Sequence, residues 1–184
     1  VSHDQICYTR APLNQELSLS IESTCDHLGI KMPPDNVDDG WTTEWHINLP
    51  SWFKKVSLGL ESGLLLVVDY MLKSDQYFTK NRKNGTLIAY RDNKANSNLL
   101  LDPGCWDITS HLCIETLQYF AENNNFKCLG KVKQGQALLA LGLADRLHSL
   151  QKSNNIKHAL DRREALLSLV DPFTLGGFYW VAFQ

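Results

Sequence analysis

The clearest hydrophobic pattern in the chain lies between residues 44 and 70. From Glu44 to Leu60, apolar side chains recur at three-to-four-residue spacing, which predicts an amphipathic helix that Gly63 ends. A continuous apolar run from Leu64 follows and closes on Asp69-Tyr70. Such a run is typical of a strand that is buried on both faces, as in a parallel sheet covered by helices.

The rest of the chain alternates between helical and strand patterns. The predicted further elements are a loop at 31–40, a long irregular functional or mobile loop at 71–104, a helix whose start signal is 107–110 and whose stop is 123–125, strands at 126–132 and 177–183, and helices at 137–150 and 162–169. This order of elements predicts an α/β fold.

Composition and charge narrow the class of protein. The chain has 184 residues, of which 43% are hydrophobic and 21% are charged, so it should fold as a globular unit. Its net charge of −2 gives no basic surface for a phosphate backbone, and we expect no nucleic-acid partner. No apolar run approaches the roughly 20 residues that span a bilayer, so we expect no membrane span.

The cysteines and the N-terminal residue give expectations about the cellular compartment of the protein. Five cysteines occur without a CxxC pair or a zinc-type Cys/His spacing, which predicts no metal site and reduced thiols in a cytoplasmic-type compartment. Cys105 and Cys113 are more plausible as small core residues than as nucleophiles. The chain begins at Val1 without a charged-then-apolar leader, so we expect no signal peptide and a longer parent protein.

Two short segments carry candidate chemistry. Asp69 ends a predicted strand, where α/β sheets collect ligands, although it could equally cap the following turn. Between Asp102 and His111, His111 could act as a base while Asp107 orients it or holds a cation. The alternative is that Asp107 or Thr109 caps a helix. Two less specific features are Trp41, which could line a binding surface, and the basic run 80–83, which could bind an anion or be solvated.

Some cofactor motifs are absent from the sequence. It contains no GxGxxG, no P-loop and no GxSxG motif, and Gly176-Gly177 is read as a turn. If the protein uses a nucleotide-type cofactor, its main binding loop therefore lies outside this chain.

Six motifs occur in an order and spacing found in a known family. They are Thr43-Glu44, Asp69-Tyr70-Met71, the block from Gly85 to Tyr90, the block from Asp102 to His111, Gln134 with Leu141-Gly142, and Asp171-Pro172 with Leu175-Gly176. Together they resemble the C-terminal half of the MidA-type S-adenosylmethionine-dependent methyltransferases. That family includes the mitochondrial complex I assembly factor that methylates an arginine of a partner protein.

The resemblance implies a fold and a division of the chain. The fold would be a partial Rossmann-like class I methyltransferase sheet, made of its last strands with an antiparallel terminal strand, together with helices and a long substrate or lid loop. Residues 1–184 would form a single unit. In it, 1–40 would be an inserted or substrate-side segment and 41–184 would complete the sheet and the substrate pocket.

The resemblance also implies a site for protein arginine methylation. Its catalytic residues would be Asp107, His111 and Glu44, with Glu44 a candidate to grip the guanidinium in bidentate fashion. Its substrate-binding residues would be Asp69, Tyr70, Tyr90 and Thr109. The cofactor would be S-adenosylmethionine, bound in the full-length protein, and the isolated fragment would be inactive.

The chain departs from the family pattern at four positions. Met71 replaces a Gly, Ile88 an Arg, Asn93 a His and Cys113 an Asp. Because a His and an Asp are lost, a non-catalytic protein-interaction module derived from the family remains an alternative.

Partners and compartment follow from the same resemblance. The partner would be a protein substrate such as a respiratory-complex subunit, and the location would be cytoplasmic, or the mitochondrial matrix in a eukaryote. The strand from Leu64 to Tyr70 should present an unpaired apolar edge. The N-terminal segment or a second copy, in a homodimer, would cover that edge.

Overall fold

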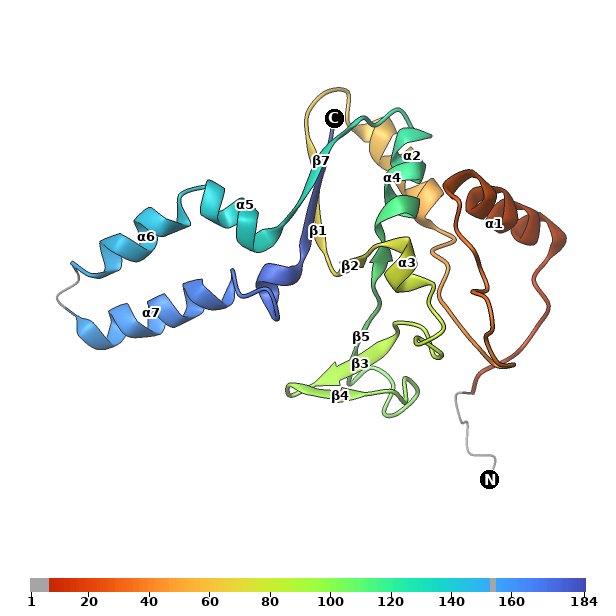
Figure 1. Ribbon diagram of the computed structural model, residues 1–184, viewed down its shortest axis with the longest axis horizontal. Helices are drawn as coiled ribbons and strands as arrows, with labels where there is room; N and C mark the ends of the chain where they lie inside the picture. The colour runs from red at the N-terminus through yellow and green to blue at the C-terminus, as the bar shows by residue number, and fades with distance from the viewer. Residues whose placement is uncertain (1–6, 153–154) are drawn as a thin grey trace. The chain divides into compact units, whose positions relative to one another are not determined.

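The computed structural model describes residues 7–152 and 155–184. The chain has a mixed α/β fold, as expected, and it divides into two compact units that interleave along the sequence (Figure 1). The first unit contains Val1–Ile47 and Leu72–Thr116, and the second contains Asn48–Met71 and Leu117–Gln184. No helix among the described residues has the length and apolar character needed to cross a membrane.

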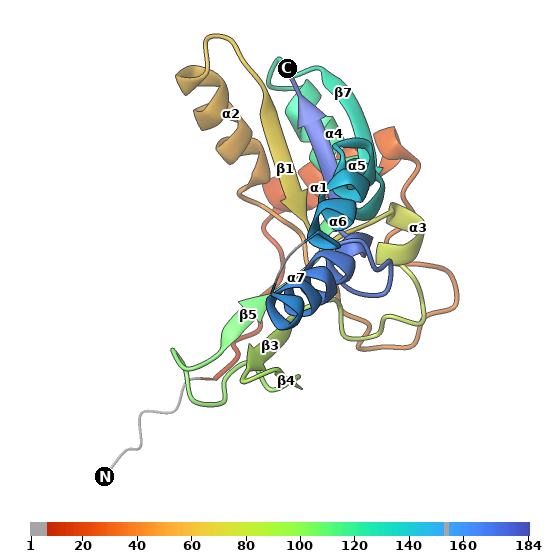
Figure 2. The same cartoon turned by 90° about the vertical axis from the view of Figure 1, so that its left-hand side faces the viewer.

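A three-stranded antiparallel sheet organises the second unit. Its order is β1 (Leu65–Asp69), β8 (Tyr179–Phe183) and β7 (Cys128–Lys133), so residues from opposite ends of the unit lie side by side (Figure 2). The predicted strands are confirmed. The expectation that β1 is buried on both faces is wrong, because Leu66 is 50% and Val68 41% exposed. Among the described residues β1 is an edge strand, as expected.

Helix α2 (Leu49–Gly59) anchors the core of the second unit through Phe53, which is fully buried. The Phe53 ring centroid lies 5.7 Å from that of Phe126 and 5.9 Å from that of Phe183. Such tilted and edge-to-face contacts are favourable geometries for aromatic pairs. The helix starts later than predicted, with Pro50 in its first turn, and Glu44 lies outside it.

The helical part of the second unit differs from the prediction at one glycine. Gly142, with φ of 90°, separates α5 (Gln134–Ala140) from α6 (Leu143–Leu150), so the predicted single helix is two. After α6 comes α7 (Ile156–Ser168), which packs beside α6 (Figure 1). The 3-10 turn η1 (Leu175–Gly177) then leads into β8.

In the first unit, helix α1 (Gln15–Leu28) was not predicted, although its ends have clear signals. Asn14 Oδ1 accepts a hydrogen bond from Leu17 N at 2.7 Å, and Gly29 ends the helix with φ of 63°. Its buried residues Ile21 and Cys25 pack in a core with Tyr77. Tyr77 ends the short helix α3 (Ser74–Tyr77).

Short strands replace much of the predicted irregular segment 71–104. A sheet of order β4 (Lys94–Asn96), β3 (Ile88–Arg91) and β5 (Asp107–Thr109) forms, and β2 (Met71–Leu72) pairs with β6 (Leu112–Cys113). The predicted helix start at 107–110 is wrong, since this segment is a strand and α4 (Ile114–Glu122) begins later. The hydrogen-bond ladder offered by β3 overrides the local capping preference.

One glycine of the second unit should be irreplaceable. A Cβ at Gly176 would meet the carbonyl of Val170 and lie 2.7 Å from the backbone oxygen of Asp171. We expect Gly176→Ala to lower the free energy of unfolding by about 1–3 kcal/mol because the backbone must shift. The control Gly59→Ala, which has open space around its Cβ, should be neutral or stabilising by about 0.5–1 kcal/mol. Urea unfolding compares them, and equal stability of the two variants would contradict the packing argument.

Candidate functional site

The Glu44 carboxylate is the centre of a hydrogen-bond network in the first unit. Thr86 N lies 2.9 Å from both carboxylate oxygens, and Leu87 N donates to Oε1 at 3.1 Å. The Thr86 hydroxyl donates to Oε2 at 2.9 Å, and the Tyr77 hydroxyl donates to the same oxygen at 3.3 Å. Glu44 therefore fixes the segment that enters β3.

Gly85 allows this close approach. Its φ is +72°, and a Cβ at this position would overlap the Glu44 carboxylate, with Glu44 Cδ at 2.7 Å. A residue with a side chain would be strained by the backbone angle and excluded by the carboxylate. The Gly85-Thr86 pair therefore has a structural reason, because Gly85 leaves space for the Glu44 carboxylate and Thr86 donates hydrogen bonds to it.

Thr86 links Glu44 to His111. The Thr86 hydroxyl, which donates to Glu44, also accepts a hydrogen bond from His111 N at 3.0 Å. One residue earlier, Ser110 Oγ lies 3.4 Å from His46 Nε2. The structure thus joins Glu44, through Thr86, to the backbone N–H of a second expected catalytic residue, His111.

Three further expected residues share one face of the β3–β5 pair. Tyr90 stands opposite Asp107, and Ile88 opposite Thr109, in an antiparallel register. Directly opposed residues in such a pair point to the same face, and so do residues two apart. Tyr90, Asp107 and Thr109 therefore lie on one face. Asp107 is exposed and takes part in none of the ion pairs between described residues.

Turn chemistry accounts for the ends of these strands. Pro103 and Gly104, with φ of 87° at Gly104, form a tight turn that Cys105 N closes on Asp102 O at 3.0 Å. After β3, Asp92 and Asn93 connect β3 to β4 with φ of 50° and 60°. These are the angles of a type I′ hairpin turn, which Asn tolerates well, so Asn93 suits its position as a turn residue.

Asp69 and Tyr70 belong to the second unit, at the end of β1. Asp69 Oδ1 accepts a hydrogen bond from Tyr70 N at 2.7 Å, which is the turn-capping alternative. The Tyr70 ring packs on Phe178 with centroids 4.1 Å apart. Asp69 is also opposite Tyr179 in the β1–β8 register. Both residues thus have structural partners within their own unit.

Burial determines the protonation of two groups near the network. Burial raises the pKa of the Tyr77 hydroxyl above its ordinary value, so this hydroxyl stays a donor to Glu44 at neutral pH. Burial also raises the pKa of the Cys113 thiol to about 11, with the Glu115 carboxylate contributing in the same direction. Cys113 is therefore a neutral core residue at neutral pH, and it does not have the thiolate character of a nucleophile.

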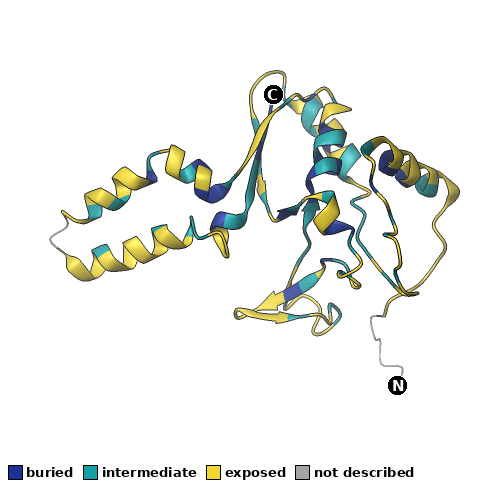
Figure 3. Cartoon of the chain, viewed as in Figure 1, coloured by how far each residue is buried: buried dark blue, intermediate teal, exposed yellow. Residues whose placement is uncertain are grey.

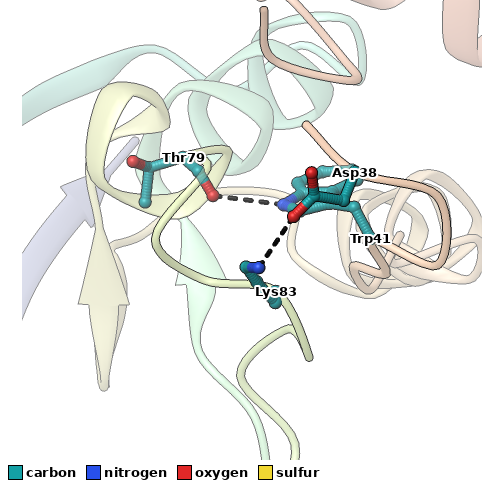
Figure 4. Close-up of polar contacts among 4 residues, drawn as sticks. All are labelled: Asp38, Trp41, Thr79 and Lys83. Atoms are coloured by element: carbon teal, nitrogen blue, oxygen red, sulfur yellow. Dashed lines mark hydrogen bonds and ion pairs between the residues drawn. The ribbon is translucent and has the colours of Figure 1, made fainter. Parts of the chain in front are cut away.

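A second polar feature of the first unit is a cleft of about 370 Å³ between the segments 36–41 and 80–84. Two contacts hold its walls together (Figure 4). Trp41 Nε1 donates to the backbone oxygen of Thr79 at 3.1 Å, and Lys83 Nζ lies 2.9 Å from Asp38 Oδ2. Trp41 lines the cleft, and none of the expected catalytic residues does.

Sequence reasoning missed three members of the network. Thr86 lies in the motif that starts at Gly85. Its place next to a glycine that the loop requires could have marked it as a contact residue. Tyr77 and His46 carry no local signal, because their roles arise only from contacts with residues 33 and 64 positions away. Within the described part of the chain, no group of three or more His, Cys, Asp or Glu side chains is placed to hold a metal ion.

Comparison with known families identifies the chain. Residues 2–132 match the model of the family described as "Putative S-adenosyl-L-methionine-dependent methyltransferase". The chain belongs to this methyltransferase family. The matched range includes the Glu44 network and the β3–β5 face, so both are parts of the family's domain. A comparison with curated proteins gave no match.

Solved structures show the same fold. A COG1565 superfamily member from Burkholderia thailandensis, crystallised with S-adenosyl-homocysteine, superposes with a TM-score of 0.82 at 24% identity. A native crystal structure of a COG1565 superfamily protein from the same organism gives 0.81 at 24% identity. Both matches cover 98% of this chain but only 44% and 46% of the solved chains. The chain therefore spans less than half the length of these relatives.

The network predicts a large effect of a nearly isosteric change. In Glu44→Gln, one acceptor oxygen becomes an NH2 group that faces backbone and hydroxyl donors. We expect the free energy of unfolding to fall by about 1–3 kcal/mol, with faster amide exchange at Thr86 and Leu87. The exposed Glu61→Gln variant should change stability by less than about 0.5 kcal/mol. If the amide hydrogen of Thr86 exchanged at the same rate in Glu44→Gln as in the unmodified chain, the assigned hydrogen bonds to Glu44 would be wrong.

The raised pKa of Cys113 predicts selective alkylation. At pH 8, iodoacetamide should modify the exposed Cys105 while Cys113, which is 2% exposed, stays unmodified in the folded chain. In urea the Cys113 thiol should react at a similar rate to Cys105. Peptide mass spectrometry measures both sites, and rapid labelling of Cys113 in the native chain would contradict its assignment as a core residue.

Proposed function

We propose that the chain is the substrate-side portion of an S-adenosylmethionine-dependent protein arginine methyltransferase of the MidA type. In this proposal it supplies the last strands of a Rossmann-like sheet. The observation that carries the proposal is the β3–β5 face, on which Asp107 and Tyr90 stand opposite each other with Thr109 beside them. Membership of the methyltransferase family supports the reaction class.

The chemistry of arginine methylation fits the residue types on this face. A guanidinium must be held in a fixed orientation, and a carboxylate does this with paired, charge-assisted hydrogen bonds. Asp107 is exposed on the face and free of ion pairs with described residues, so it can take a cationic partner. Tyr90 and Thr109 line the same face and orient the substrate, and the imidazole of His111 accepts the departing proton.

Glu44 has a positioning role in this proposal. Both of its carboxylate oxygens already accept hydrogen bonds from Thr86, and Leu87 and Tyr77 add two more donors. A bidentate grip on a substrate guanidinium would require these bonds to break. Glu44 instead holds Thr86, and Thr86 holds the backbone of His111 at 3.0 Å.

The methyl donor does not fit over three glycines of the second unit, Gly135, Gly176 and Gly177. A cradle for a ligand needs glycines with open space above the backbone. Gly135, Gly176 and Gly177 instead lie against backbone oxygens of the segment 170–172. The Asp69 carboxylate is engaged by Tyr70 N. We therefore assign donor binding to a part of the protein outside this chain, a proposal supported by relatives of more than twice its length.

The edge of β1 is consistent with that assignment. Among the residues that the structure describes, β1 pairs only with β8, and its residues Leu66 and Val68 are exposed. An apolar edge strand is a site where a further strand adds to a sheet. We propose that a strand of the donor-binding part occupies it. Asp69 and Tyr70, at the end of β1, would then face the donor side.

The second candidate is a protein-interaction module without catalysis. The observation that favours it is Cys113, which occupies the position of an Asp in the family pattern and is a buried, neutral thiol. In this case the β3–β5 face would dock an arginine-bearing partner without methyl transfer. The same face serves both candidates, so only a measurement of transfer separates them.

The experiment uses the longer protein that contains this chain, with arginine peptides from respiratory-complex subunits and radiolabelled S-adenosylmethionine. We expect methyl transfer by the unmodified protein. We expect Asp107→Ala to lower kcat/KM by about 10²-fold or more, because the substrate guanidinium loses the carboxylate that orients it. Calorimetric titration should show unchanged donor affinity in that variant.

The matched control is Asp92→Asn, which changes an exposed turn acid whose positive φ Asn accepts. It should keep the activity of the parent. Absence of donor binding to the longer protein would end the methyltransferase proposal. Donor binding without transfer to any arginine peptide would favour the interaction module. Full activity of Asp107→Ala would remove Asp107 from the site.

A further inference from the structure

Helix α7 carries an apolar seam that the described part of the chain leaves exposed. No residue of α7 is buried, and Figure 3 shows most of this helix in the exposed class. Ile156 is 74%, Leu160 57% and Leu167 41% exposed. With Arg163 they follow a 4-3-4 spacing, which is the d-a-d-a pattern of a coiled-coil seam.

The seam borders a groove of about 340 Å³ between α6 and α7. Leu147 and Leu150 of α6 line one wall, and Ile156, Leu160 and Arg163 of α7 line the other. Apolar side chains therefore line both walls, beside Gln151 and Arg163, and α6 covers only one flank of the seam. A helix that lay along α7 would place its own apolar side chains over this groove.

We infer that the occupant is α7 of a second copy of this chain, packed antiparallel. In that pairing, a positions meet d positions of the partner helix. Ile156 then faces the second Leu167, and Leu160 faces the alkyl stem of the second Arg163. The seam matches itself about a twofold axis between residues 161 and 162, which is the requirement for an isologous interface.

The charges beside the seam favour the same partner. Lys157 and Glu164 hold the e positions, on the flank that α6 does not cover. In an antiparallel pair the e positions face each other, so Lys157 of each copy meets Glu164 of the other. Two equivalent Lys157–Glu164 ion pairs therefore form across the interface. A parallel pairing, or a partner with unrelated charges, would not use both residues.

The size of the interface sets its strength. Two helices of 13 residues bury less than the roughly 1,200 Å² of a standard stable complex, so the dimer is weak and reversible. Sedimentation velocity of the chain, over about 1–500 μM, measures it. We expect a monomer–dimer equilibrium within this range.

A charge swap tests the pairing. Lys157→Glu and Glu164→Lys each place like charges at both e–e contacts, so each should weaken dimerisation by about tenfold. An equimolar mixture of the two variants should dimerise again as a heterodimer, because all four charges are then paired. The control Asp161→Lys, on the side of α7 away from the seam, should behave like the unmodified chain.

Three outcomes would overturn the inference. They are a monomeric chain over the whole range, single variants that dimerise like the unmodified chain, and a mixture that does not recover. Self-association through the exposed edge of β1 gives the second of these outcomes, because it does not depend on residues 157 and 164. Circular dichroism of each variant verifies that α7 is still helical, and Leu160→Asp should abolish the dimer without changing that signal.

Discussion

The carboxylate of Glu44 is the constraint on which the first unit depends. It collects donors from Tyr77, Thr86 and Leu87, which come from segments more than 30 residues away in the sequence. A buried or half-buried carboxylate is costly unless its oxygens are satisfied, and here the donors that satisfy it also order the backbone leading into β3. Gly85 is required because no side chain fits beside that carboxylate.

The Glu44 network supports one end of the β3–β5 face. Glu44 holds residues 86 and 87, which lead directly into β3, and the register of β3 with β5 sets Tyr90 opposite Asp107. Thr86 then connects the anchor to His111, so the start of β3 and the end of β5 are held at one point. A site that must hold a cation in a fixed orientation needs this kind of support, because misplacement by about 1 Å is costly in catalysis.

The second unit is stabilised differently, by apolar packing of α2 on its three-stranded sheet. Phe53 contacts two other phenylalanines, from β8 and from the segment before β7, and is fully buried. Its glycines at 135, 176 and 177 lie against the backbone of residues 170–172 and give no ligand cradle. Its open surfaces are the edge of β1 and the seam of α7, which differ in kind. One exposes backbone hydrogen-bonding groups, and the other exposes side chains.

Local sequence patterns were enough to predict the apolar strands at 65–69 and 179–183, the helix that carries Phe53, and the motif residues of the candidate site. These elements are specified by local periodicity and by short turn and glycine signals, which neighbouring residues determine. The sequence did not determine that 107–109 is a strand, because the capping preference of Asp and Thr is weaker than a ladder with β3. Nor did it reveal the partners of Glu44. Those contacts join residues that are distant in the chain, and only the tertiary structure brings their donors to one carboxylate.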